Sequence, residues 1–245
     1  MTALSHIPGP LSTLQNTLVQ GNCLNVLPQL DTGSVDFVLT DPPYGARYKA
    51  RDGRSVPNDD NLEWLAPVCC ELYRVLKRNR FVVSFYGWPN AHKFVSAFHA
   101  AGFRVVGHFV FPKHYTSGTG YVGYRHECAY LLAKGRPVKT RSPIADVIPW
   151  TKYTGNRFHP TQKPLAILTP LIEAFSNPGD VVLDSFMGSG STCLAAKHAG
   201  RDYIGIELDP TFYTAAQRRL EAACKSDAAS QKSSGSAVLC APCFW

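Results

Sequence analysis

The fold is decided by one stretch of the chain, VVLDSFMGSGST at residues 181–192. Three apolar residues followed by an acid predict a buried strand with a carboxylate at its end. Gly188 and Gly190 let the backbone pass close to a ligand, and the helix expected from Ser191 offers free N–H groups at its start. The stretch therefore predicts a strand, a tight glycine turn and a helix in direct succession.

A second acid indicates what this turn would bind. Glu207 ends the next expected strand, 17 residues after Gly190, where a carboxylate can accept both hydroxyls of a ribose. A dinucleotide fingerprint would need a third glycine where Cys193 stands, and no Gly-Lys-Ser/Thr sequence follows to make a P-loop. These features favour an adenosine-bearing cofactor over a turn that serves only the structure.

Strand-like and helix-like stretches alternate along most of the chain, which predicts an α/β fold with a parallel sheet. The expected strands are residues 35–40, 81–86, 103–111, 128–132, 180–184 and 203–208. The expected helices are residues 61–76, 89–101, 164–176, 191–199 and 210 to about 224, with Gly102 placed to end the second of them.

Composition bounds the class of protein. With 245 residues and 45% hydrophobic side chains, the chain suits one packed core and is not globally disordered. No apolar run is long enough to span a bilayer, and the first ten residues lack the pattern of a secretory signal, so no membrane association is expected. The eight cysteines are interpreted as reduced thiols of a cytoplasmic protein. A net charge of +7 favours a polyanionic partner.

Most of this charge lies in one segment, residues 108–158, which holds eight Lys and Arg against two acids. We interpret this segment as an insert on the core with its own surface role. Residues 1–107 and 159–224 are expected to form two halves of that core. Residues 225–245, rich in Ser, Ala, Gly and Lys, are expected to form a mobile tail.

The corner Asp41-Pro42-Pro43-Tyr44 directly follows an expected buried strand. Its prolines remove two N–H donors, which leaves the Asp41 carboxylate and the Pro42 carbonyl as acceptors beside the ring of Tyr44. Two acceptors and a stacking surface suit a planar ring that bears an exocyclic NH₂ group. The alternative is a turn that ends a strand and buries a tyrosine.

Three motifs in this order resemble the beta class of amino-group DNA methyltransferases: DPPY at 41–44, HPTQKP at 159–164 and LDSFMGSG at 183–190. Further matches are GNCL at 21–24, RVLK at 74–77, RHE at 125–127 and YIGIE at 203–207, so the resemblance extends from about Leu18 to Ala222. It implies a seven-stranded, Rossmann-like, circularly permuted S-adenosylmethionine-dependent α/β fold with a target-recognition insert. It also implies double-stranded DNA as the substrate.

The resemblance implies roles for individual residues. Asp41 and Pro42, followed by Pro43, would bind the target amine, and Tyr44 would stack on a base flipped out of the duplex, so that the methyl group moves by direct in-line attack. Asn22 stands where many relatives have Asp, and Ser185 replaces a usual proline. The residues implied at the S-adenosylmethionine site are Asn22, Cys23, Asp41, His159, Thr161, Lys163, Asp184, Phe186, Gly188, Ser189, Gly190, Thr192, Glu207 and Leu208.

Basic residues in two segments are expected to contact DNA. The segment 45–58 is proposed as a loop that closes over DNA, and the segment 108–158 is expected to hold phosphates and read bases. The candidates are Arg47, Lys49, Arg51, Arg54, Lys113, Arg125, Lys139 and Arg141, whereas His126 and Glu127 are consistent with a structural role.

Several functional alternatives stay open from the sequence. The spelling with Asp first is associated mostly with adenine N6, and cytosine N4 is the nearest alternative. Methylation of RNA or of a protein amide, and a non-catalytic nucleic-acid module, are more distant ones. A second copy of the chain and a cognate restriction enzyme are further partners to consider for this class. No metal site is expected, because the histidines show no ligand pattern and Cys240 and Cys243 lack a second pair.

Overall fold

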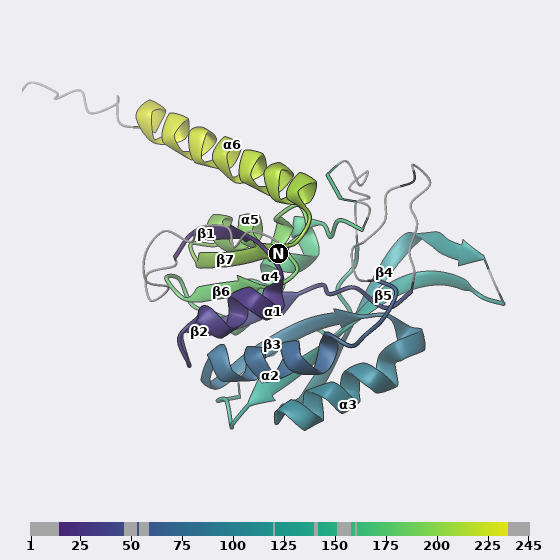
Figure 1. Ribbon diagram of the computed structural model, residues 1–245. Coiled ribbons are helices and arrows are strands. Elements are labelled where there is room, and N and C mark those ends of the chain that lie inside the picture. The colour runs from purple at the N-terminus through teal and green to yellow at the C-terminus, as the bar shows by residue number, and fades with distance from the viewer. Residues whose placement is uncertain are drawn as a thin grey trace, which may run out of the picture.

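The computed structural model describes residues 15–46, 53, 59–119, 121–139, 142–150, 158–159 and 161–234 (Figure 1). The strands are β1 (Thr17–Gln20), β2 (Val35–Thr40), β3 (Leu76–Tyr86), β4 (Arg104–Thr119), β5 (Gly123–Lys134), β6 (Val181–Asp184) and β7 (Asp202–Glu207). The helices are α1 (Cys23–Val26), α2 (Leu65–Val75), α3 (Ala91–Ala101), α4 (Leu165–Phe175), α5 (Ser191–His198) and α6 (Pro210–Ser234). The short 3-10 helices η2 (Leu27–Gln29) and η3 (Trp88–Asn90) lie between them.

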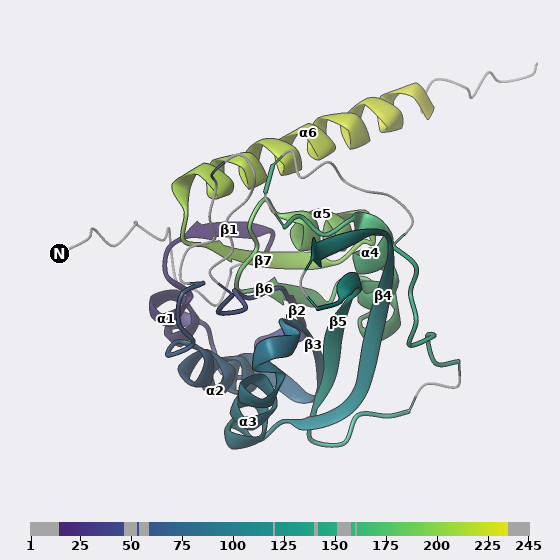
Figure 2. The same cartoon turned by 90° about the vertical axis from the view of Figure 1, so that its right-hand side faces the viewer.

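The seven strands form one sheet in the order β1-β7-β6-β2-β3-β5-β4, which confirms the expected seven-stranded α/β fold. The first five in this order are parallel to one another, and β5 runs antiparallel to both of its neighbours. The chain leaves β2 toward α2 on one face and leaves β6 toward α5 on the other (Figure 2). Open α/β sheets bind ligands at the carboxyl ends of their strands beside such a point.

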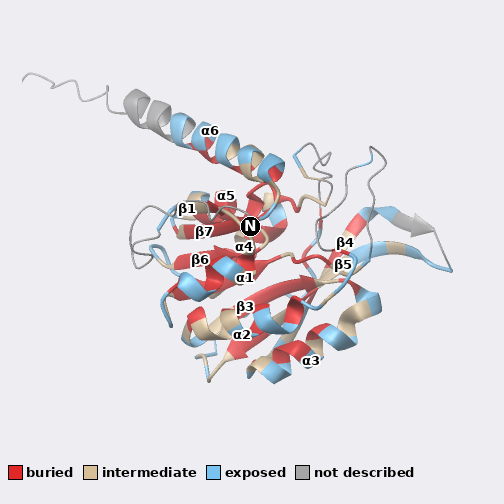
Figure 3. Ribbon diagram, in the orientation of Figure 1, coloured by how far each residue is buried: buried red, intermediate tan, exposed pale blue. Residues whose placement is uncertain are grey.

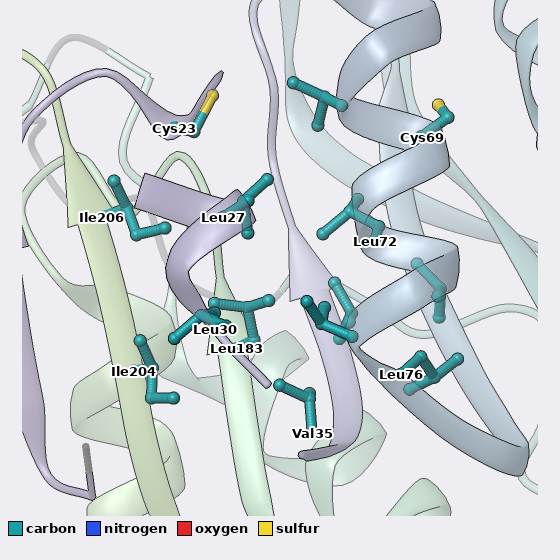
Figure 4. Close-up of a cluster of buried hydrophobic side chains, with 14 of the residues drawn as sticks. Cys23, Leu27, Leu30, Val35, Cys69, Leu72, Leu76, Leu183, Ile204 and Ile206 are labelled. Carbon is teal, nitrogen blue, oxygen red and sulfur yellow. The ribbon is translucent and has the colours of Figure 1, made fainter. Parts of the chain in front are cut away.

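Helices cover both faces of the sheet. One apolar layer lies beneath α1, α2 and α3, and Figure 4 shows part of it, with Leu27, Leu72 and Ile204 converging from three elements. The other layer lies beneath α4, α5 and α6. Along β2, Val38 belongs to the first layer, whereas Phe37 and Leu39 belong to the second. All six residues of β2 are therefore buried, as in parallel strands covered on both faces, and the neighbouring strand β6 is buried as well (Figure 3).

The boundary expected for an insert at His108 differs from the structure. Tyr86, the last residue of β3, pairs with Cys128, which also pairs with Val110, so β4 and β5 are strands of the main sheet up to that point. Only the outer part of these strands, residues 111–119 and 121–127, extends past the end of β3, and we call it the overhanging hairpin (Figure 1). A charge count over a whole segment does not show which of its residues pair within the main sheet and which extend beyond it.

Two further elements differ from expectation. Helix α6 continues to Ser234, where a mobile tail was expected from residue 225. Residues 225–234 contain no Gly or Pro, and their Ala, Lys and Gln side chains favour a helix, whereas Gly235 follows directly. Strand β1 was not expected at all, because four residues are too few to show a period.

No helix in the described part of the chain combines the length and the apolar character needed to cross a membrane.

Candidate active site

The carboxyl ends of β2 and β6 bring three distant segments together around one pocket. These segments are the end of β2, the residues before α4 and the glycine turn before α5, and Phe85 and Leu168 also line the pocket. The pocket lies at the point where the connections leave the sheet on opposite faces. Nine of the residues expected at the site line it: Asp41, His159, Thr161, Lys163, Asp184, Phe186, Gly188, Ser189 and Thr192.

The corner after β2 holds an aromatic ring beside a carboxylate. The Tyr44 hydroxyl donates to Asp41 Oδ1 at 2.6 Å, and Asn90 Nδ2 donates to the Tyr44 carbonyl at 2.8 Å. A Cβ atom added at Gly87 would lie only 2.7 Å from Tyr44 Cβ, so only glycine at that position accommodates the tyrosine. Pro42 and Pro43 are buried. Asp41 thus already accepts one hydrogen bond within its own motif, which the sequence did not indicate.

A buried lysine occupies the other oxygen of this carboxylate. Lys163 Nζ lies 2.5 Å from Asp41 Oδ2 and 3.1 Å from Glu127 Oε2. Glu127 Oε1 in turn lies 3.4 Å from Lys113 Nζ. Two carboxylates and two ammonium groups therefore alternate in a line that begins at Asp41 and reaches β4, and we call these four residues the charged cluster.

Burial and neighbouring charges act in opposite directions on these groups. Burial raises the pKa of Asp41, and the ammonium group of Lys163 only partly offsets this effect. Burial also raises the pKa of Glu127, but Lys163 and Lys113 outweigh it and hold that pKa below its ordinary value. Burial lowers the pKa of Lys163, but the negative charges of Asp41 and Glu127 raise it by more. The net shift of the Lys163 pKa is therefore upward, and the ammonium form persists.

The glycine turn adopts the backbone that its sequence predicts. Gly188 and Gly190 have φ values of 52° and 76°, a region that favours glycine. A Cβ atom at position 190 would lie 2.9 Å from the Cβ atom of Ala216 on α6. The turn is therefore pressed between the pocket and a helix, which leaves its backbone close to any ligand held there.

Two carboxylates border the turn. Glu207 accepts from the N–H groups of Gly188 and Asp209, each at 2.8 Å, and burial raises its pKa to about 7. Asp184 accepts from Thr40 Oγ1 at 3.0 Å and from the Phe186 N–H at 3.1 Å, and burial raises its pKa to about 6. A carboxylate offers about four lone-pair positions, so Glu207 retains the capacity to accept two hydroxyl groups.

The remaining residues expected at the cofactor site lie around this centre. Asn22 caps α1 by accepting from the Leu24 N–H at 2.9 Å, and Gln20 pairs with Glu207, so Asn22 and Cys23 follow a strand beside that carboxylate. The Phe186 ring meets Trp64 edge-on at 5.0 Å. Leu208, directly after β7, is exposed.

Helix α6 supports the turn from outside. Arg219 donates to the Ser189 carbonyl, and it also donates to Ser189 Oγ at 3.0 Å and Ser191 Oγ at 3.2 Å. Phe212 packs against the ring of His159, with centroids 4.3 Å apart. A helix that the sequence predicted only as part of the core thus contacts two segments of the pocket.

The basic residues expected to contact DNA have different environments. Lys113 is buried and paired with Glu127, which differs from the expected phosphate contact. Arg125 is exposed on the overhanging hairpin. Lys139 is also exposed, but it comes after β5 has ended at Lys134. Lys134 pairs with Arg80, so this end of β5 is opposite to the end that carries the hairpin. Arg47, Lys49, Arg51, Arg54 and Arg141 lie outside the described residues.

Sequence reasoning missed Glu127 and Arg219 as residues of the site. The RHE motif at 125–127 was a usable signal for Glu127, because it was part of the family pattern but had no assigned chemistry. Nothing local marks Arg219, since its partners are about 30 residues away in the chain. Among the described residues, no group of His, Cys, Asp and Glu could hold a metal ion.

Comparison with known proteins finds a family whose model matches this chain. The model of a DNA methylase family named N6_N4_Mtase matches residues 35–218 of this chain. YubD of Escherichia coli (strain K12), a provisionally named methylase, is 54% identical over 204 residues, which cover 83% of this chain and 89% of YubD. The DNA adenine methyltransferase YhdJ of the same organism is 29% identical over 247 residues, which cover 84% of this chain and 83% of YhdJ.

A solved structure shows a similar fold. TTHA0409, a provisionally named DNA modification methylase from Thermus thermophilus in complex with S-adenosyl-L-methionine, is 25% identical and superposes with a TM-score of 0.64. The match covers 82% of this chain and 91% of the Thermus protein. The chain therefore resembles these proteins over nearly all of its described core.

Proposed function

Since this chain belongs to the N6_N4_Mtase family of DNA methylases, we propose that it transfers a methyl group from S-adenosylmethionine to the N6 amine of adenine in double-stranded DNA. One observation carries the proposal: Asp41 and the glycine turn at Gly188, which lie far apart in the chain, line the same pocket. A methyl donor on the turn and an amine on Asp41 would therefore meet. The Thermus relative, which binds S-adenosylmethionine, supports this cofactor.

The residues present fit S-adenosylmethionine. Gly188 and Gly190 give the turn a backbone without side chains, and Glu207 has acceptor capacity for the hydroxyls of a ribose. Asn22 lies within reach of the same end of the sheet. The cofactor supplies a methyl group that its sulfonium already activates, so no covalent intermediate with the protein is required.

The chain then has to prepare the nucleophile. The Asp41 carboxylate and the Pro42 carbonyl accept hydrogen bonds from the two N–H groups of the target amine, which favours a tetrahedral nitrogen with its lone pair free for in-line attack. The nitrogen gains the methyl group as the methyl–sulfur bond breaks, and the methylated amine then releases one proton to solvent. The hydroxyl bond to Asp41 fixes the Tyr44 ring beside that carboxylate, so a base bound to Asp41 lies within reach of the ring. Stacking on this ring contributes about 1–3 kcal/mol toward the cost of leaving the duplex.

Adenine is the base we favour. The corner begins with Asp, and the relative YhdJ is named as a DNA adenine methyltransferase. Cytosine N4 is an exocyclic amine of the same kind, and the family name covers both targets.

The deciding experiment is transfer of a labelled methyl group from S-adenosylmethionine to duplex DNA of mixed sequence, followed by nucleoside analysis. We expect the label in N6-methyladenine. Label in N4-methylcytosine would correct the base, and label only in RNA or protein would overturn the DNA substrate.

Replacing the acceptor tests the mechanism directly. Asp41→Ala should abolish methyl transfer while the Kd for S-adenosylmethionine, measured by calorimetry, stays within about threefold of wild type, because the glycine turn and Glu207 are untouched. Near-wild-type turnover in this variant would remove Asp41 from the mechanism.

A further inference from the structure

We propose that Lys163 and Glu127 are positioning residues for Asp41: the Lys163 ammonium keeps the Asp41 carboxylate ionised and oriented, and Glu127 holds that ammonium in place. This inference rests on the proposed function, in which Asp41 accepts a hydrogen bond from the target amine. Lys163 and Glu127 act on the reaction only through that carboxylate.

The geometry around Lys163 supports this role. Its ammonium group donates to Asp41 Oδ2 at 2.5 Å and to the Tyr44 hydroxyl at 3.5 Å, and it forms an ion pair with Glu127 Oε2 at 3.1 Å. The Lys163 side chain is only 4% exposed, so water competes little for these contacts. An ammonium held by two carboxylates cannot swing away from either without leaving a buried charge behind.

The charges of the cluster balance. Asp41 and Glu127 carry two negative charges, and Lys163 and Lys113 carry two positive ones. Removing any one member leaves an uncompensated charge in a largely buried place, which is costly. The four residues therefore form one electrostatic unit and not a set of independent surface pairs.

The charged cluster connects the corner at Asp41 to the overhanging hairpin. Glu127 is on β5 and Lys113 on β4, just past the end of β3 at Tyr86. Asp41 follows β2, and Lys163 precedes α4. The base of the hairpin thus supports the carboxylate that the proposed chemistry uses.

The signs of the neighbouring charges give the proposal a distinctive signature. Burial and the like charge of Glu127 raise the pKa of Asp41, whereas Lys163 lowers it. Replacing Lys163 should therefore raise that pKa, and replacing Glu127 should lower it. The titratable groups that face Asp41 are Tyr44 from its own corner, Glu127 from β5, Asp184 from β6, and His159 and Lys163 from the segment before α4.

The titration of Asp41 can be followed without any activity. Protein labelled with ¹³C at the aspartate carboxyl groups is titrated by NMR, and Asp41→Asn identifies the resonance. We expect Lys163→Met to move the Asp41 titration up by about 1–3 pH units, and Glu127→Gln to move it down. An unmoved titration in both variants would overturn the positioning pair.

Kinetics test the order in which the residues act. In Lys163→Met, kcat near about pH 7 should fall about tenfold or more, the loss should shrink at higher pH, and KM for S-adenosylmethionine should stay within about threefold. Glu127→Gln should lower kcat in the wild-type background but cause no further loss in the Lys163→Met background, since Glu127 acts through Lys163. A loss of kcat that is equal at every pH would indicate a structural role and contradict the proposal.

A control breaks a more exposed ion pair, between β3 and the start of β2. Lys77 Nζ lies 2.8 Å from Asp36 Oδ2, and Asp36 is buried near the other end of the strand. Lys77→Met should lower the free energy of unfolding and leave the Asp41 titration in place. Should Lys163→Met fail to fold, Glu127→Gln decides through its kcat as well as its Asp41 titration, and a wild-type kcat in that variant overturns the pair. If the variants show these titration shifts but the wild-type protein methylates no DNA, the proposed function is overturned and the pairing with Asp41 stands.

Discussion

Glu207 joins the end of β7 to the glycine turn and is also the acceptor proposed for the cofactor ribose. Its carboxylate accepts the N–H groups of Gly188 and Asp209, which ties the glycine turn to the end of β7. Because burial raises the pKa of Glu207 to about 7, its charge changes close to neutral pH. Cofactor affinity should therefore depend on pH in this range.

The Kd for S-adenosylmethionine should rise as the pH falls below about 7, by up to about tenfold per pH unit, because protonated Glu207 loses acceptor capacity for the ribose. Calorimetry across about pH 5.5–8.5 measures it, and Glu207→Gln should bind weakly and lose the change in Kd at about pH 7. A wild-type Kd that does not change with pH would contradict the assigned contact.

The same titration affects the free protein with the opposite sign. Since the folded pKa of Glu207 is above its unfolded value, its contribution to stability is present at low pH and is lost as the pH rises through about 7. Burial raises the pKa of Asp184 to about 6, and this carboxyl acts in the same direction.

At this scale the sequence predicted residues that lie in short motifs. Asp41, Gly188 and Glu207 each end a strand or form a turn, so local pattern was enough to find them. Lys163 also lies in such a motif, but its pairing with Asp41 and Glu127 could not be found in this way, because it exists only after β5 and the segment before α4 have packed beside β2. Pairing between distant segments is a property of the fold and not of a motif.

At the level of elements, the start of α5 depends on close packing against α6. Gly190 has a positive φ, and a Cβ atom there would also collide with Ala216. Gly179 has a similar φ of 81° but has no atom within 4 Å of the position where a Cβ would be. A substitution at Gly179 therefore tests the cost of the backbone conformation alone, and one at Gly190 adds the cost of a collision with Ala216.

Gly179→Ala should lower the free energy of unfolding by about 1–2 kcal/mol, the cost of a left-handed conformation for a residue with a Cβ atom. Gly190→Ala should lower it by about 1–3 kcal/mol more, because Ala216 must also move. Urea denaturation measures both values. Equal losses in the two variants would mean that the contact between the turn and α6 adjusts freely.

Helices and strands were predictable where the spacing of apolar residues followed one pattern over their whole length. The helix ending at Gly102 and the buried strand β2 follow from spacing alone. The sequence places part of β4 and β5 in an insert because the basic charge of residues 108–158 is counted over the whole segment, whereas only Lys134 of these basic residues lies where the two strands belong to the main sheet. After residue 225 a serine-rich composition predicts a mobile tail. The absence of Gly and Pro before residue 235 is the stronger signal, and α6 continues to Ser234.

At the scale of the whole molecule, the overhanging hairpin and the pocket share the carboxyl edge of the sheet. A duplex that reaches Asp41 would pass beside Arg125, whereas Lys139 lies beyond the other end of β5. The structure thus separates the two candidates that are both described and exposed, Arg125 beside the pocket and Lys139 far from it, a distinction that net charge could not make.

DNA affinity should fall steeply with salt, and Arg125→Ala should reduce the slope of log Kobs against log salt concentration by about 1. Lys139→Ala is the matched control, since it removes the same charge but should leave the slope unchanged. Fluorescence anisotropy with a labelled duplex measures both. Equal slopes for wild type and Arg125→Ala would place the DNA elsewhere.

The long strands β4 and β5 also limit how new target preferences can be introduced. They carry the overhanging hairpin and, at its base, Lys113 and Glu127 of the charged cluster. A hairpin transplanted from a relative would bring its own side chains to these two positions and so alter the electrostatics beside Asp41. If the charged cluster acts as proposed, a chimera with an exchanged hairpin is expected to keep activity only when Lys113 and Glu127 are retained.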